Sequence, residues 1–194
     1  MIKKQLDLIF PLTRITWEAL CEIGEEKMIR KNQNLATQGE HFNYEVFVVE
    51  GVLRSFHITD EGKEYSASFY REGNFVMPAF ARQSNGKSIL NIQALELSKV
   101  VVFDEKKFTA LRHGYEDLFM LGSIVSEREL LTKSLKEVLL ATGNLKELYL
   151  FFQDRYPNFQ SRISQRHIAS YMGVDPVSLS RVKAKLLKEE KGIG

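Results

Sequence analysis

The stretch QRHIASYMGVDPVSLSRVKAKL, residues 165–186, places a glycine between two amphipathic segments and follows it shortly with Asp-Pro. In a helix-turn-helix the two helices cross steeply, so the inward positions are apolar, one contact is small and the turn must tolerate a positive φ. The residues expected to meet these requirements are Ile168, Met172, Val174, Leu179 and Val182 inside, Ala169 at the small contact and Gly173 in the turn. Asp175 is expected to cap the second helix, with Pro176 at its first position.

The second helix of this motif keeps an outward face that is short, polar and basic. We expect Val177, Ser178, Ser180 and Arg181 on its N-terminal half, where a recognition helix contacts base edges in the major groove. Arg181 can donate two hydrogen bonds to guanine O6 and N7, so it is the expected base reader. The expected phosphate contacts, which add affinity and salt dependence, are Arg166, Lys183 and Lys185. The alternative, an ordinary helical hairpin, explains the apolar spacing but not the basic outward face.

Composition and charge are compatible with this interpretation. The chain has 194 residues, 44% of them hydrophobic, which is typical of one large or two small domains, and we expect two. The net charge of +2 is unevenly spread: residues 161–194 contain seven Lys or Arg and three Asp or Glu, so this tail carries +4 and the remainder −2. The asymmetry favours a tail that meets a polyanion, although a merely solvated basic end has the same count.

Cys21 is the single cysteine, so the chain can form no internal disulfide and cannot supply the four thiolates of an iron–sulfur cluster. A reducing compartment is the natural setting, and we interpret Cys21 as a packing residue. At the N-terminus, Asp7 and Pro11 interrupt the run MIKKQLDLIFPL before a secretory core can form. No apolar stretch of the sequence approaches the roughly 18 residues needed to span a bilayer, so we expect a cytoplasmic protein with no membrane partner.

The first half of the chain reads as an antiparallel β structure. A short helix is expected after Thr16 as N-cap, with Glu18 in its first turn. Short β-type runs separated by glycine-bearing turns then follow, at residues 46–51, 52–58, 64–70, 89–95 and 99–103. Regular strands and turns without intervening helices predict an antiparallel barrel, roll or sandwich.

A long helix is expected over about residues 115–142, followed by a shorter one in LKELYLFFQDRY. Its broad apolar stripe comprises Leu118, Leu121, Ile124, Val125, Leu131, Leu135, Val138 and Leu139. At 1.5 Å per residue the helix is about 40 Å long, more than a small barrel can cover. We therefore expect the same helix of a second copy to pair with it in a two-fold homodimer. A helix packed wholly on its own domain, which Arg128 within the stripe also allows, is the alternative.

The order of β-roll, long helix, short helix and helix-turn-helix defines an α+β fold and resembles the Crp/Fnr family of bacterial transcription regulators over nearly the whole chain. Three stretches carry this resemblance: FVVEGVLRSFHITDEGKEYSASFYREGNFV for the β-roll, YLFFQDRYP before the DNA-binding domain, and HIASYMGVDPVSLSRVKAKL for the helix-turn-helix. The resemblance implies a β-roll sensor domain at 1–113, a dimerisation helix at 114–142 and a DNA-binding domain at 143–194.

The same resemblance assigns roles and partners. By position, Arg181 matches the base-contacting arginine of the family, with Val177 and Ser178 beside it, while Ser164 and Arg166 match phosphate contacts. The implied partners are double-stranded DNA with a near-palindromic site, a second copy of the chain, and RNA polymerase. The chain stops at KEEKGIG, directly after the recognition helix, so we expect the β-hairpin wing of the family to be missing.

The sequence departs from the relatives that bind cyclic AMP. Their glutamate for the ribose hydroxyl is replaced by Pro78, and their arginine for the cyclic phosphate falls at Ser88, or at Lys87 if the register slips by one. Proline can neither accept that hydrogen bond nor donate a backbone N–H. The pair that would meet the purine falls at Glu129 and Leu130, which do not match either. We therefore expect no cyclic AMP binding and an effector of unknown identity, with Lys87 and Ser88 as a weak anion site or a solvated turn.

Other classes of protein are less consistent with the residues present. The histidines, His41, His57, His113 and His167, lack metal-ligand spacing, so we expect neither haem nor another metal or cofactor. A β-roll enzyme of the cupin type needs histidines and a carboxylate that converge on a metal, and we expect no catalytic residue here. A signalling module whose helical tail docks a protein stays open, although Arg181 and its neighbouring serines argue against it.

Overall fold

The computed structural model describes residues 2–76, 85–190 and 192. Within this part of the chain, eight strands form two four-stranded antiparallel sheets. In the first sheet the order is β1 (Gly24–Ile29), β8 (Ser98–Asp104), β3 (Tyr44–Glu50) and β6 (Phe75–Val76). In the second sheet it is β2 (Asn34–Ala36), β7 (Asn91–Ala94), β4 (Leu53–Ile58) and β5 (Glu64–Tyr70).

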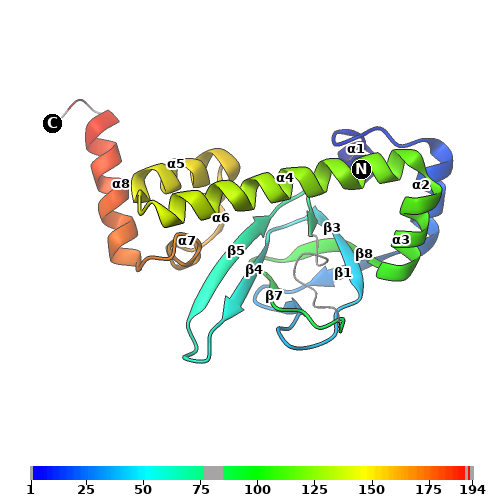
Figure 1. Cartoon of the computed structure of the whole chain (residues 1–194), viewed down its shortest axis with the longest axis horizontal. Helices are drawn as coiled ribbons and strands as arrows, with labels where there is room; N and C mark the ends of the chain where they lie inside the picture. Colours follow the sequence, from blue (N-terminus) through cyan, green and yellow to red (C-terminus); the bar gives the residue numbers. More distant parts are fainter. Residues whose placement is uncertain (1, 77–84, 191, 193–194) are drawn as a thin grey trace.

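Helices precede and follow the sheets. Along the chain they are α1 (Ile2–Asp7), α2 (Arg14–Ile23), α3 (Glu105–Gly114), α4 (Glu116–Ala141), α5 (Leu145–Arg155), α6 (Phe159–Arg162), α7 (Gln165–Tyr171) and α8 (Pro176–Glu190). Figure 1 shows α4 extending along the molecule above the sheets, with α1–α3 near one end and α5–α8 near the other. The C-terminal end of α8 points away from the rest of the chain (Figure 1).

The two sheets enclose one hydrophobic core, and the outer face of the first sheet is covered as well. In β3, Val46 and Val48 face the core between the sheets, whereas Phe47 and Val49 belong to a second cluster that includes side chains of α2, α3 and the start of α4. This two-sided covering explains why the interior of β3 is continuously buried. The expected α+β fold with an antiparallel β-roll is confirmed.

A third cluster joins the second sheet to the C-terminal helices. Phe69 of β5 is 1% exposed and packs with Phe152, Tyr156, Phe159 and Tyr171. The shortest of these ring-centroid distances, to Tyr156, is 5.5 Å, within the usual range for aromatic pairs. The helical part of the chain therefore shares a core with the roll, and the division at residues 113 and 142 remains a prediction.

The sequence located the long strands but not the short or charged ones. Strands were expected where β3, β4, β5, β7 and β8 lie, whereas β1, β2 and β6 were not anticipated. The predicted N-cap at Thr16 is wrong: α2 begins at Arg14, and the hydroxyl of Thr13 accepts the Thr16 N–H as the cap. The Thr16 hydroxyl instead donates to Asp117 at 2.7 Å, a partner 101 residues away.

The long helix forms at the expected place, but its apolar stripe does not serve one purpose. Leu118, Leu121 and Val125 are buried in the cluster beneath α4 in their own chain, which contradicts their assignment to a dimer interface. The first turns of α4 lie over the outer face of β3 and β8, so these three side chains already have intramolecular partners. Among the described residues, no helix combines the length and apolar character needed to cross a membrane.

The β3–β4 turn passes close to Ser98 at the start of β8, and Gly51 in that turn allows this close approach to be tested. Gly51 has φ +99°, and a Cβ there would lie 2.7 Å from the Ser98 Cα, whereas Gly62 has φ +79° but open space around it. Gly62→Ala should lose about 1 kcal/mol of unfolding free energy through its backbone conformation alone. Gly51→Ala should lose a further 1–3 kcal/mol, roughly, because Ser98 must move. Urea unfolding measures both, and equal losses would contradict the predicted clash.

Candidate nucleic-acid interface

Helices α7 and α8 form the expected helix-turn-helix. Ile168, Ala169, Met172 and Leu179 are at most 1% exposed, and Gly173 lies in the turn with φ +67°. Val174 and Val182 pack against the same core. Glycine adopts a positive φ without the steric cost of a Cβ, so Gly173 suits this turn. The predicted inward face is confirmed residue by residue.

Asp175 caps α8 as the sequence predicts. Its Oδ1 accepts the backbone N–H groups of Val177 and Ser178, both at 2.9 Å, and Pro176 is the first helical residue. Hydrogen bonds from the Ser178 backbone and hydroxyl hold the pKa of Asp175 below its ordinary value. The Ser178 hydroxyl donates to Asp175 Oδ2 at 2.7 Å, so this predicted base contact is already engaged in the cap.

The remaining outward residues of α8 are accessible. Val177 is 60% exposed, and Ser180, Arg181 and Lys185 are exposed as well. In the described part of the chain, no hydrogen bond or ion pair engages the Arg181 guanidinium. Its donors are therefore free for an incoming ligand, whereas a helix buried on this side could present none of them.

The N-terminal end of α7 lies beside α8. Ser164 is exposed and caps α7, its hydroxyl accepting the His167 N–H at 3.4 Å. Lys183 of α8 donates to Gln165 Oε1 at 3.0 Å, so the side chain of Lys183 reaches the start of α7. Gln165 was not singled out from the sequence, although its place directly after the N-cap is the signal that could have identified it. These residues form a continuous polar surface across both helices.

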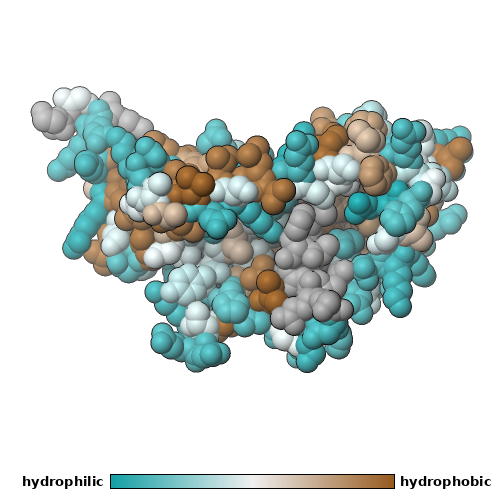
Figure 2. All heavy atoms as spheres, in the orientation of Figure 1, coloured by the Kyte–Doolittle hydropathy of each residue, from teal (hydrophilic) through white to brown (hydrophobic). Residues whose placement is uncertain are grey.

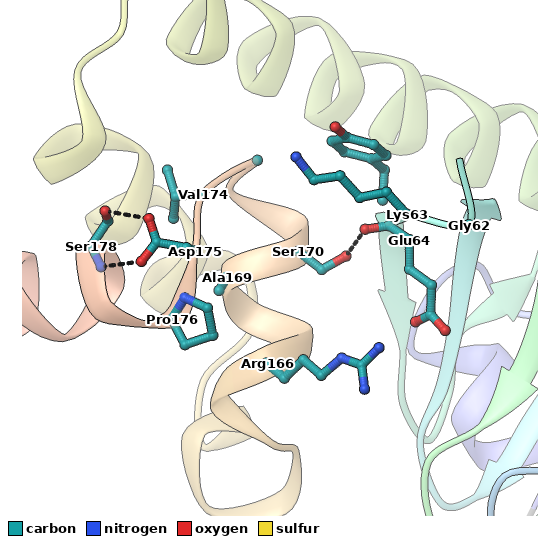
Figure 3. A pocket seen from close by; sticks show the side chains of 12 residues that line it. Gly62, Lys63, Glu64, Arg166, Ala169, Ser170, Val174, Asp175, Pro176 and Ser178 are labelled. Atoms are coloured by element: carbon teal, nitrogen blue, oxygen red, sulfur yellow. Dashed lines mark hydrogen bonds between the residues drawn. The ribbon is translucent and has the colours of Figure 1, made fainter. Parts of the chain in front are cut away.

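Arg166 faces a cleft between the helix-turn-helix and the β4–β5 hairpin. The cleft has a volume of about 590 Å³, and Lys63 and Glu64 of the hairpin line it together with Arg166, Ser170 and Ser178. Figure 3 shows the Arg166 side chain directed toward the hairpin from α7. Arg166 is exposed and remains accessible to an anion that enters this cleft.

His167 lies on the buried side of α7 and does not contribute charge. Burial, with repulsion from Arg54, lowers the pKa of His167 to about 4, so the imidazole is neutral at pH 7. Arg54 is 2% exposed and pairs with Glu64 at 2.8 Å, which leaves the net charge of this buried group near zero. The described residues contain no group of three His, Cys, Asp or Glu side chains placed to hold a metal ion.

Helix α7 is held on β5 by polar contacts in addition to Phe69. The Ser170 hydroxyl donates to the Glu64 carbonyl at 2.8 Å and accepts the Ser66 N–H at 2.9 Å (Figure 3 shows the first bond). Lys136 of α4 donates to the Ser66 and Ala67 carbonyls at 2.9 and 3.1 Å. Burial, with repulsion from Lys133, lowers the pKa of Lys136 to about 7. Lys136 was not predicted from the sequence, because a single lysine on α4 does not alter the apolar pattern of the helix.

Fewer residues of the predicted α4 stripe are exposed than expected, but the exposed face continues toward the N-terminal end of the helix. Leu131, Leu135 and Val138 are between 44% and 59% exposed, and Met120 continues the same face toward the start of the helix. Ile124 is half-buried. Leu139 is half-buried and packs against the core of the helix-turn-helix, so its place at a dimer interface stays a prediction. Figure 2 shows hydrophobic side chains gathered along the side of the molecule where α4 runs.

The candidate effector residues do not form an open anion site. Ser88 is 4% exposed, and its hydroxyl donates to the Leu90 carbonyl at 2.6 Å within a turn. Lys87 is exposed and its backbone pairs with His41. Pro78 lies outside the described residues. The Ser88 hydroxyl therefore stabilises a turn, and the weak anion site at Lys87 and Ser88 stays a prediction.

The two α4 residues that align with the purine contacts face different ways. Glu129 is buried and lies 3.4 Å from Arg155, and burial raises the pKa of Glu129 although Arg155 opposes the shift. Leu130 is 60% exposed on another side of the helix. Adjacent residues of an α-helix point about 100° apart, so Glu129 faces the interior of its own chain while Leu130 faces solvent.

Comparison with known proteins is consistent with this geometry. Residues 26–115 match the cyclic nucleotide-binding domain family. Over 197 aligned residues, the chain is 27% identical to the regulatory protein HlyX of Actinobacillus pleuropneumoniae, covering 95% of this chain and 81% of HlyX. It is 28% identical to the fumarate and nitrate reduction regulatory protein of Yersinia pestis, covering 95% and 78% of the two chains.

Solved structures show the same fold. FixK2 of Bradyrhizobium japonicum superposes with a TM-score of 0.72 at 19% identity, over 87% of this chain and 86% of FixK2. The FixK2 match covers most of the chain and so extends well beyond residues 26–115, which match the domain family. Over most of its length the chain is therefore similar to these two regulatory proteins, and it shares the fold of FixK2.

Proposed function

We propose that the protein regulates transcription as a homodimer that binds a near-palindromic DNA site through α8. The observation that carries the proposal is the exposed N-terminal half of α8, where Arg181 is without a protein partner among the described residues. The opposite side of the helix-turn-helix is buried against the roll, so α8 can enter a major groove without rearrangement of its own core.

Arg181 is proposed as the base reader, with Val177 and Ser180 as its neighbours on the same surface. A guanidinium can donate two hydrogen bonds to guanine O6 and N7 in the major groove. Val177 offers an apolar contact of the kind that a thymine methyl group accepts. Ser178 is better placed to stabilise the start of α8, because its hydroxyl already donates to Asp175.

Phosphate contacts are proposed for the flanking residues Ser164, Arg166, Lys183 and Lys185. Ser164 and Arg166 are both exposed at the start of α7, so their side chains are accessible to a phosphate oxygen. Cationic side chains at these positions neutralise phosphates regardless of sequence and make binding salt-dependent. RNA polymerase is a further proposed partner, for which no single surface is assigned.

The second copy is proposed to pair along the exposed face of α4. Met120, Leu131, Leu135 and Val138 recur on one side of the helix, where water would otherwise contact these apolar side chains. Pairing of this face across a two-fold axis would present one α8 from each copy to DNA. A signalling module without DNA binding is the second candidate, but it gives no reason for the exposed Arg181.

Arg181→Ala is predicted to weaken specific DNA binding by about 1–3 kcal/mol and to relax the preference at one base pair of each half-site. Mobility-shift titrations over a salt series measure this effect. The parent should favour two half-sites about one helical turn apart, or a multiple of that, and should bind more weakly as salt rises.

Two variants serve as controls for Arg181. Lys185→Ala should weaken binding to all sequences alike and reduce the salt dependence. Arg14→Ala, on the distant helix α2, should leave DNA binding unchanged. A parent protein that binds every sequence equally would contradict the proposed function, whereas an Arg181→Ala variant that keeps the parent's preference would contradict only the assigned reader.

Replacement of Leu131 and Leu135 by Lys is predicted to dissociate the dimer. Each leucine buried at an interface contributes about 1.5–3 kcal/mol, so each change should weaken association about tenfold or more. Leu150→Lys on α5 is the matched control, since Leu150 is 44% exposed but lies outside this face. Sedimentation velocity over a range of concentrations measures the dimer fraction, and dimers of undiminished affinity in the double variant would contradict the proposed interface.

The roll is proposed not to bind cyclic AMP, because the buried Glu129 is paired with Arg155, Leu130 has no polar group to offer a purine, and the Ser88 hydroxyl is engaged in a turn. Calorimetric titration of the purified protein with cyclic AMP should therefore give no saturable heat at physiological concentrations. Tight, saturable uptake would overturn this part of the proposal without affecting the proposed DNA interface.

A further inference from the structure

Arg162, the last residue of α6, contacts two turns of the roll. Its Nη1 donates to Glu72 Oε2 at 3.0 Å and its Nη2 to Glu72 Oε1 at 2.6 Å. The same Nη2 also contacts Glu96 Oε1. Glu72 belongs to the β5–β6 turn and Glu96 to the β7–β8 turn. One guanidinium thus ties α6 to two separate turns of the roll; Arg162, Glu72 and Glu96 are called here the Arg162 cluster.

The geometry of the Arg162 cluster fixes the orientation of α6 relative to the two turns of the roll, as well as its distance from them. A guanidinium that donates two parallel bonds to one carboxylate is planar and bidentate, which a flexible ammonium cannot reproduce. All three side chains are only about one-third exposed, so solvent screens the pair less than at a free surface. The cluster is therefore expected to hold an orientation and not merely to add surface charge.

Glu72 is itself held in place by the roll. Its Oε1 accepts the Gly51 N–H at 2.9 Å, in the turn where a side chain at Gly51 would meet Ser98. Partial burial opposes ionisation, but the Arg162 guanidinium and backbone donors keep the pKa of Glu72 below its ordinary value. The carboxylate stays charged at neutral pH, and its position is set by the β3–β4 turn.

The position of Arg162 in the chain connects this cluster to α7. Ser164, the N-cap of α7, follows two residues later, and the intervening Ile163 is buried in the shared core. At the other end of α7, Ser170 bonds to β5. Helix α7 is therefore tied to the roll at both ends, and α8 leaves α7 through the short turn at Gly173. The direction of α8 depends on both attachments.

We propose that Arg162 is a positioning residue that fixes the direction of α8 relative to the roll and thereby the separation of the two α8 helices in the dimer. This proposal rests on the proposed function. In a two-fold dimer, the separation of the recognition helices sets the spacing of half-sites that both can contact. Arg162 would then determine spacer length without touching DNA.

The test measures DNA affinity against a series of sites whose spacer differs from the best one by single base pairs. The parent should discriminate strongly between spacers. Arg162→Gln should reduce that discrimination about tenfold, because the bidentate charge-assisted pair is lost. Its affinity for an isolated half-site should remain unchanged, since the reading surface of α8 is intact. Glu72→Gln and Glu96→Gln should each lose part of the discrimination between spacers. Arg162→Lys should discriminate better than Arg162→Gln but less well than the parent.

Arg14→Gln, which removes an exposed arginine from α2, is the matched control and should keep the parent's spacer preference. Should Arg162→Gln fail to fold, the two glutamine variants of Glu72 and Glu96 carry the test. Unchanged discrimination in folded variants that still bind their half-site would overturn the role of Arg162 alone. A parent protein without specific DNA binding would overturn the proposed function and this inference with it.

Discussion

The burial of Phe69 among the aromatic side chains of the C-terminal helices determines how the two parts of the molecule are arranged. Its ring centroid lies between 5.5 and 6.1 Å from those of Phe152, Tyr156, Phe159 and Tyr171. Large aromatic rings bury much apolar area and prefer tilted or edge-on contacts of this kind. The helix-turn-helix is consequently packed on the roll as part of one core, and a change in the roll can reach α7 through direct contact.

This packing leaves two surfaces free for partners. One is the N-terminal half of α8 with the exposed Arg181, and the other is the apolar face of α4 around Leu131 and Leu135. The α8 surface suits a polyanion because it offers hydrogen-bond donors. The α4 face suits the same face of a second chain because the side chains named here are apolar. Regulation of a DNA-binding dimer then requires a ligand that favours one arrangement of the two parts over another.

Local patterns in the sequence predicted the features that depend on neighbours in the chain. The spacing of Ile168, Ala169 and Leu179 with Gly173 identified the helix-turn-helix, and short β-type runs between glycine-bearing turns identified β3 and β4. The charged strand β1, with sequence GEEKMI, is no such run and was missed. Strand β2 has three residues, too few to show a recognisable strand pattern in the sequence.

Features that depend on distant partners could not be predicted in this way. An apolar stripe on α4 does not reveal whether its partner is the roll or a second copy, so Leu118 and Leu121 were assigned to the wrong surface. The bonds from Arg162 to Glu72 and from Thr16 to Asp117 join residues 90 and 101 positions apart. Such pairs become visible only when the tertiary structure brings the segments together.

Methylation interference on a selected DNA site tests most directly whether α8 reads the major groove from both copies. Methylation at guanine N7 blocks an acceptor in that groove and leaves the phosphates intact. The account predicts loss of binding at guanines in two symmetric clusters about one helical turn apart, or a multiple of it. Binding that is insensitive to N7 methylation, or that responds only to modification in the minor groove, would contradict it.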